Sequence, residues 1–113
     1  MGEVELKDEV HSWYLELDED DQARVRFHID RLAEYGPLLD EPFTRQLEGP
    51  LRELRFVLHG RNFRVTYWIA TGRHIVVLTV FTKTQRREAR QIARALRAYR
   101  LCIAEKHLEQ EPT

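Results

Sequence analysis

The most constraining feature of this chain is a run of three strand patterns joined by two very short connections. The connections are built around His59-Gly60 and Thr71-Gly72. Strands joined so tightly pair as antiparallel neighbours. The third pattern, Ile-Val-Val-Leu-Thr-Val-Phe, is apolar almost throughout, which suits a strand covered on both faces. The sequence therefore predicts an antiparallel meander whose strands cover residues 51–58, 62–70 and 74–81.

Helical spacing of apolar residues precedes and follows this meander. Residues 7–17 and 20–35 predict two helices that meet at the acidic cluster 18–21, because Asp caps helix N-termini and complements the helix dipole there. Gly36-Pro37 ends the second helix. A last helix is predicted over residues 85–107. Its apolar stripe comprises Ala89, Ile92, Leu96, Tyr99 and Ile103.

Two further segments complete the predicted fold. Val4 and Leu6 alternate with acidic residues and predict a short first strand, whereas residues 36–50 contain three prolines and two glycines and predict an irregular connection. The fold class is therefore α+β, as one domain over residues 1–113. A helix hairpin is expected on one face of a small antiparallel sheet of three to four strands, with a basic C-terminal helix. The other face is expected to be solvated or to hold a ligand.

Charge is divided unevenly along the chain. Residues 1–40 carry 12 acidic and 4 basic side chains, whereas residues 45–100 carry 13 basic side chains against 3 acidic ones, an excess of 10. Of those 13 cations, 12 are arginine, whose planar guanidinium grips phosphate through several donors. This part of the chain is expected to face a polyanion. Mutual neutralisation of the two halves is the alternative, although it does not account for the whole excess.

Other features of the composition exclude several classes of protein. The single cysteine, Cys102, rules out an internal disulfide and a metal site built from several cysteines, and we expect it to be a buried thiol. The longest apolar run, residues 75–81, is too short to span a bilayer. The N-terminus lacks the basic start and apolar stretch of a signal peptide. We expect a cytoplasmic protein without membrane contact and without a cofactor.

Strand alternation collects one carboxylate and several cations on one face of the meander. Glu53 and Arg55 share the parity opposite to the core residues, and pairing around the first turn brings Arg64 beside them. Lys83 directly follows the third strand and is expected at the rim. RNA cleavage by the 2′-hydroxyl needs a base and cations that stabilise the phosphorane, so Glu53 is a candidate base and the three cations candidate clamps. The alternative is an ordinary cross-strand ion pair on a wet face.

Other side chains are weaker candidates for chemistry. Trp68 has the parity of Arg64 and is a candidate for stacking on a base, unless it only covers a sheet edge. His59 and His74 are candidate acids or bases because imidazole in general titrates near neutrality, although histidine is also ordinary in turns. His28 is expected to be a partly buried packing residue. No histidine pair has helical metal-ligand spacing with a carboxylate nearby, so no metal site is expected.

The predicted last helix carries a stripe of arginines roughly opposite its apolar stripe. Its only interspersed acid is Glu88. Such a stripe suits a phosphate backbone, ribosomal RNA included. A solvated helix face and an acidic protein partner are the alternatives. The predicted RNA- or ribosome-binding residues are Arg86, Arg87, Arg90, Arg94 and Arg97 of this helix, with Arg52 and Arg61 of the meander.

Three segments follow one another in an order and spacing found in a known family. They are Gly-Pro-Leu-Arg-Glu-Leu-Arg at 49–55, Phe-Arg-Val-Thr-Tyr at 63–67 and Leu-Thr-Val-Phe-Thr-Lys-Thr-Gln at 78–85. They resemble the Glu-Leu-Arg strand, the Tyr-Arg-Val-type strand and the Phe-x-Lys-Lys-Thr-type segment of the HigB-like, phage-derived branch of the RelE/ParE toxin superfamily. Residues 4–10 with Trp13 are similar too. This chain departs from that pattern where Arg87-Glu88 replaces Thr-Pro and where Thr82 or Thr84 replaces the second lysine.

The resemblance implies the toxin of a type II toxin–antitoxin system, a ribosome-dependent, metal-independent mRNA endoribonuclease that blocks translation. It implies an antitoxin partner, often a helix-turn-helix protein, together with the ribosome and mRNA, and operator DNA reached only through the antitoxin. It assigns RNA handling to Arg55, Arg64 and Lys83, with Glu53 as possible base, and leaves the general acid unassigned. Two alternatives are a ParE-like toxin that binds DNA gyrase without cutting RNA and a degenerate toxin that only binds its antitoxin.

Overall fold

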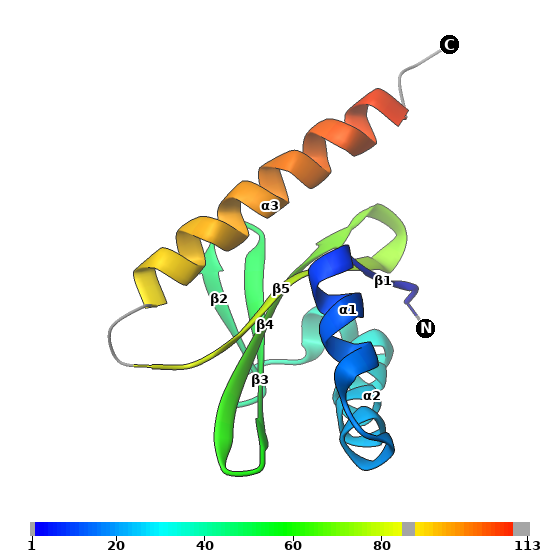
Figure 1. The fold of residues 1–113 in the computed structure, drawn as a ribbon. Coiled ribbons are helices and arrows are strands. Elements are labelled where there is room, and N and C mark those ends of the chain that lie inside the picture. Colours follow the sequence, from blue (N-terminus) through cyan, green and yellow to red (C-terminus); the bar gives the residue numbers. More distant parts are fainter. Residues whose placement is uncertain (1, 85–87, 110–113) are drawn as a thin grey trace.

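The computed structural model describes residues 2–84 and 88–109 of the chain (Figure 1). Five strands form one sheet in the order β1-β5-β4-β3-β2, with helices on both of its sides. The strand β1 pairs parallel with β5, and the other neighbours are antiparallel. The elements are β1 (Val4–Leu6), α1 (Asp8–Glu16), α2 (Glu19–Tyr35), β2 (Thr44–Glu48), β3 (Leu51–Leu58), β4 (Arg61–Ala70), β5 (His74–Thr82) and α3 (Glu88–Glu109).

The meander and the helix hairpin are confirmed. The strands β3, β4 and β5 pair in sequence order, and β5 is buried along most of its length. Asp18 caps α2 by accepting a hydrogen bond from the Asp21 backbone N–H at 2.8 Å. Gly36 ends α2 with a φ of 52°, and a Cβ added there would lie 2.9 Å from Nη2 of Arg73, so both conformation and space favour glycine.

The sheet has more strands than the sequence predicted. The short first strand exists as β1, and residues 44–48, expected to be irregular, form β2 at the opposite edge. The sequence Thr-Arg-Gln-Leu-Glu of β2 contains a single apolar residue, and the side chains of Arg45, Gln46 and Glu48 are exposed. Polar edge strands of this kind lack the alternating apolar signal from which strands are predicted.

Helices cover both faces of the sheet, so the prediction that they all lie on one face is wrong (Figure 1). On one face α1 and α2 pack through Val10, Val25 and Leu32 on the strand residues Leu54, Phe56, Val65 and Tyr67. On the other face α3 crosses the sheet and packs through Ala95 and Cys102 on Leu51, Val76 and Leu78. A sheet between two helical layers buries apolar residues on both sides, which explains the continuous apolar sequence of β5.

The apolar stripe of α3 was predicted with a small rotational error. Leu96 and Tyr99 do contact the sheet, but Ala95 and Cys102 are the buried residues of the stripe, and Ile103 is exposed. Cys102 is 1% exposed, which confirms the expectation of a buried thiol. The predicted helix start at residues 85–87 lies outside the described residues. No helix in the described part of the chain is long and apolar enough to cross a membrane.

Candidate active site

The face of the sheet that carries α3 is organised in successive rows across the strands. Leu51 and Trp68 lie in the row under α3. The next row holds Glu53, opposite Thr66 on one side and Arg45 on the other. The rows that follow along β3 and β4 pair Arg55 with Arg64, and then Val57 with Asn62. Moving away from α3, the surface thus changes from apolar to a buried charge, then to an arginine pair, and finally to an exposed valine and amide.

Glu53 is the buried acid of this surface. Its side chain is 0% exposed, and Oε2 lies 3.6 Å from Nε of Arg55 and 3.6 Å from Nε of Arg64. Neither carboxylate oxygen accepts a hydrogen bond from any residue that the structure describes. Burial raises the pKa of Glu53, opposed by the charges of Arg64 and Arg55, while Glu88 adds to the rise and Arg45 opposes it. Glu53 is therefore a carboxylate with an increased affinity for a proton.

The two arginines lie between Glu53 and solvent. Arg64 is 6% exposed, and burial lowers its pKa, helped by the neighbouring charge of Arg55. Both arginines line a hollow of about 220 Å³, together with Pro42, Phe56, Val57 and Asn62. Glu53 does not line it. A ligand that enters this hollow meets two guanidinium groups, and the carboxylate lies behind them.

Lys83 lies where the sequence placed it, at the edge of this surface. Its backbone N–H donates to the carbonyl oxygen of Asn62 at 2.7 Å, which extends the pairing of β5 with β4 by one residue beyond Thr82. The side chain of Lys83 is exposed, as is that of Arg61 at the start of β4. Two exposed cations thus lie at the same end of the sheet as the hollow, where they add positive potential for an incoming anion.

The structure confirms the predicted convergence and corrects the predicted exposure. Parity correctly brought Glu53, Arg55 and Arg64 together on one face. That face is not open, however, because α3 covers it at one end and Glu53 and Arg64 are buried. Trp68, expected to stack on a base, instead packs edge-on against Tyr99 of α3, with ring centroids 5.2 Å apart. Trp68 is half-buried and part of its ring is taken up by this contact, so stacking on a base has no support in this geometry.

The predicted arginine stripe of α3 divides into two groups. Arg90 and Arg97 are exposed and have no hydrogen-bond or ion-pair partner among the described residues. Arg94, in contrast, forms an ion pair with Glu9 of α1 and donates to the Val80 carbonyl oxygen at 3.3 Å. It ties α3 to α1 and to β5, so its side chain is committed within the fold. Arg86 and Arg87 lie outside the described residues.

Arg52 lies on the other face of the sheet. Its Nη2 is 3.5 Å from the Asp40 carboxylate and donates to Oγ1 of Thr44 at 3.1 Å. Alternation along β3 places it opposite Glu53 and Arg55, so it is separated from the candidate site by the sheet itself. The prediction that Arg52 contacts RNA alongside Arg55 therefore has no support in this geometry.

The histidines do not join the candidate site. His59 pairs with Asp21 of α2 at 2.8 Å, and His74 pairs with Glu5 of β1 at 3.0 Å. His28 stacks on Phe56 with ring centroids 4.9 Å apart, which confirms it as a packing residue. Ligand atoms of Asp18, Asp21 and His59 lie within 4.8 Å of one another, but helix capping and the Asp21–His59 pair already account for that grouping.

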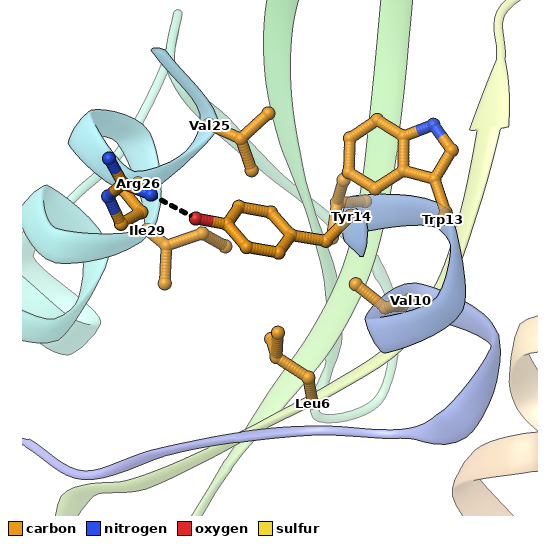
Figure 2. Close-up of a pocket in the computed structure, with 8 residues that line it drawn as sticks. Leu6, Val10, Trp13, Tyr14, Val25, Arg26 and Ile29 are labelled. Atoms are coloured by element: carbon orange, nitrogen blue, oxygen red, sulfur yellow. Dashed lines mark hydrogen bonds between the residues drawn. The ribbon is translucent and has the colours of Figure 1, made fainter. Parts of the chain in front are cut away.

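A second cavity lies on the opposite side of the sheet, between α1, α2 and Val65 of β4 (Figure 2). Its volume is about 230 Å³, and its walls are almost entirely apolar. Tyr14 and Arg26 are its polar residues, and the Arg26 guanidinium donates to the Tyr14 hydroxyl (Figure 2). Since it holds no carboxylate and its one cation is already bonded, this cavity offers no acid–base chemistry.

Sequence reasoning missed two groups of residues that shape the candidate site. Thr66 and Thr79 are buried beside Glu53, with their hydroxyls hydrogen-bonded to each other. Arg45 lies across from Glu53 on β2, a strand that the sequence did not predict. The polar Thr79 within an apolar strand was the available signal for the first group. No local signal marked Arg45.

The comparisons with known proteins agree with this architecture. The crystal structure of the intact E. coli RelBE toxin–antitoxin complex contains a chain similar in fold, with a TM-score of 0.56 and 11% sequence identity. The match covers 76% of the present chain and 100% of that chain. No curated protein is similar enough in sequence to match. The fold is therefore of the type found in that toxin–antitoxin complex.

The family assignment is more specific. The phage-derived Gp49-like protein family matches residues 12–100, which include the second half of α1, all of α2, the meander and the first part of α3. The chain belongs to this family, which is one of the RelE/HigB-type toxin families. This confirms the resemblance to the phage-derived branch of the superfamily.

Proposed function

We propose that the chain is a ribosome-dependent mRNA endoribonuclease, the toxin of a type II toxin–antitoxin system. The observation that carries the proposal is the convergence of Glu53 with Arg55 and Arg64, each 3.6 Å from the carboxylate, on the face that ends in a solvent-accessible hollow. Membership of a RelE/HigB-type toxin family supports the class of protein. One carboxylate with raised proton affinity beside two guanidiniums can supply the base and the phosphate-binding cations for 2′-hydroxyl attack on phosphate.

In the proposed reaction the guanidiniums of Arg55 and Arg64 hold the scissile phosphate in the hollow. Glu53 accepts the proton of the adjacent 2′-hydroxyl as its oxygen attacks phosphorus. The bond from phosphorus to the 5′-oxygen breaks, which leaves a 2′,3′-cyclic phosphate on one product and a 5′-hydroxyl on the other after that oxygen gains a proton. The arginines stabilise the charge that develops on the phosphorane. Lys83 and Arg61 attract the RNA towards this end of the sheet.

The proposed partners follow from charge and from the relatives. The exposed Arg90 and Arg97 of α3 suit contact with the phosphate backbone of the ribosome or of mRNA. A toxin with this activity needs an antitoxin, and the structural relative was crystallised with one. We propose a cognate antitoxin for this chain, of the helix-turn-helix kind that the sequence resemblance implies, with operator DNA bound only through it. The activity is proposed for the cytoplasm, where ribosomes are available.

Controlled expression in bacteria without an antitoxin tests this function. The wild-type chain should arrest growth and cleave mRNA on ribosomes, while chromosomal DNA stays intact. Arg55→Gln and Arg64→Gln should each relieve the arrest, with a loss of about 100-fold or more in cleavage. Arg52→Gln is the matched control, because Arg52 lies on the same strand but on the opposite face.

Three outcomes would contradict the proposal. Full toxicity of both Arg55→Gln and Arg64→Gln would place the site elsewhere. DNA damage with intact mRNA would indicate a gyrase-directed toxin of the ParE type. Absence of any toxicity from a folded chain would indicate a degenerate toxin that only binds its antitoxin.

A further inference from the structure

Arg55 and Arg64 are closer to the hollow than Glu53 is. The hollow is lined by Arg55 and Arg64, and Glu53 lies behind them, 0% exposed. An anion that enters the hollow therefore meets the same guanidinium groups that now neutralise the carboxylate. Guanidiniums bind phosphate through two parallel N–H groups and favour it over a contact at 3.6 Å with no hydrogen bond. Ligand and carboxylate are thus competitors for one pair of cations.

Among the residues that the structure describes, nothing else near Glu53 replaces those cations. The hydroxyls of Thr66 and Thr79 are bonded to each other, and Thr66 also accepts from the Thr79 backbone N–H at 3.2 Å. Within residues 2–84 and 88–109, the charged groups that act on Glu53 are Arg64 of β4, Arg55 of β3, Arg45 of β2 and Glu88 of α3. Arg45 is the weakest of these influences and Glu88 opposes ionisation. When an anion occupies Arg55 and Arg64, the buried carboxylate loses most of its charge compensation.

We propose that this cluster is a proton-coupled phosphate site, in which binding of a phosphodiester to Arg55 and Arg64 is accompanied by uptake of a proton at Glu53. This inference deepens the proposed function and rests on it for the identity of the ligand. With a substrate RNA the proton comes from the 2′-hydroxyl. With an anion that has no such hydroxyl it comes from solvent. The base is therefore weaker in the free protein than in the complex with a phosphate.

This coupling has a functional consequence for a toxin. A permanently available base would act on any hydroxyl or water that reached it, whereas Glu53 is shielded by its own phosphate clamp until the clamp is occupied. The same groups therefore bind the substrate and switch on the base. Ordinary ion pairing on the sheet predicts no such link, because there the arginines would stay with the carboxylate whatever the hollow contained.

Isothermal titration calorimetry tests the coupling without any cleavage. The probes are sulfate and a 2′-deoxy dinucleotide, neither of which changes protonation near neutral pH or offers a 2′-hydroxyl. Titrations in two buffers of different ionisation enthalpy give the number of protons taken up per ligand. For the wild-type chain we expect uptake approaching one proton, and an affinity that falls by up to about tenfold per pH unit in the range where coupling is complete.

Glu53→Gln separates proton uptake at this carboxylate from uptake at any other group, because it removes the ionisable group and preserves its size. This variant should bind both probes at least as tightly, without the uptake seen in the wild type. Glu88→Gln is the matched control and should keep the uptake, because Glu88 does not contact the arginines through any ion pair in the described structure. Stronger coupling with the dinucleotide than with sulfate identifies a nucleic-acid site, and equal coupling identifies a general anion site.

Uptake of the same size in Glu53→Gln as in the wild type would overturn the inference. Binding by the wild-type chain that does not change with pH, or no binding of either probe, would overturn it as well. The coupling and the nuclease activity can fail separately. If the chain binds the dinucleotide with proton uptake but cuts no RNA, the proposed reaction is contradicted and the coupling is supported.

Discussion

The two ends of the α3-facing side of the sheet differ in a way that separates stability from function. At one end Leu51, Trp68 and Val76 lie under α3 as parts of one apolar cluster. At the other end the same strands carry Glu53, Arg55 and Arg64, of which two are buried charges. Figure 1 shows α3 crossing the sheet obliquely, so one helix covers the strands unevenly. Apolar burial attaches α3 at the covered end, whereas the other end buries charged groups at a cost in desolvation.

The largest expected effect is on activity at the charged end. Glu53→Gln removes the proposed base while preserving its shape, so RNA cleavage should fall by about 10²- to 10⁴-fold, as measured in a ribosome-bound mRNA cleavage assay.

The same variant should change the stability of the fold. Because burial raises the pKa of Glu53 in the folded chain, the folded state becomes less stable as pH rises and Glu53 ionises. The variant should therefore unfold at a higher temperature than the wild type at pH 7, and acidification should remove this difference. Lower stability at pH 7 together with normal cleavage would contradict both assignments.

Next in size is the loss of stability at the covered end. Leu78 is buried beneath α3, so Leu78→Ala should lower the free energy of unfolding by about 2–5 kcal/mol in urea denaturation. Val57→Ala is the matched control at the charged end, where the side chain is 56% exposed, and should change stability by about 0.5 kcal/mol at most. Equal losses in the two variants would mean that the ends do not differ as described.

A smaller effect is expected on nucleic-acid binding when the exposed cations of α3 are removed. Arg90→Gln with Arg97→Gln should leave the unfolding temperature unchanged and weaken binding to ribosomes or RNA. The dependence of log affinity on log salt should flatten by about 0.7 for each charge that contacts a phosphate. Binding measurements at several salt concentrations check this. An unchanged slope would mean that this face of α3 does not contact nucleic acid.

The smallest effect is expected at the tie between α1 and α3. Glu9 pairs with Arg94 and accepts a hydrogen bond from the Val80 backbone N–H at 3.0 Å. The pair is partly exposed, so Glu9→Gln should cost about 0.2–1 kcal/mol in thermal or urea unfolding. Activity should persist, because the tie lies outside the Glu53 cluster. A loss larger than that of Leu78→Ala would make this pair, and not the apolar contact, the main attachment of α3.

The sequence predicted those features that depend on local periodicity. Alternation along two strands was sufficient to place Glu53, Arg55 and Arg64 on one face, since side chains two residues apart must share it. The short turns likewise predicted the meander. Whether that face was open depended on where α3 docks, which is a contact between elements far apart in the sequence. The burial of Glu53 could not be read from its neighbours for this reason.

Other errors have the same origin. The strand β2 was missed because a polar edge strand lacks apolar alternation. Arg94 was grouped with the RNA-facing arginines because helical spacing cannot reveal that Glu9, 85 residues away, binds it. Trp68 was taken for an exposed ring because its contact with Tyr99 exists only in the folded chain. Periodicity identifies the side of an element on which a residue lies, and tertiary packing decides what covers that side.

The chemistry of the RNA ends tests the central claim most directly. Ribosome-bound mRNA cleaved by the purified chain should carry a 2′,3′-cyclic phosphate and a 5′-hydroxyl at each cut, and these ends should be lost from reactions with Arg64→Gln. Mapping with an RNA ligase that requires such ends, alongside one that requires 5′-phosphates, distinguishes the possible products. Cuts that carry 3′-hydroxyl and 5′-phosphate ends would contradict 2′-hydroxyl attack at Glu53, Arg55 and Arg64.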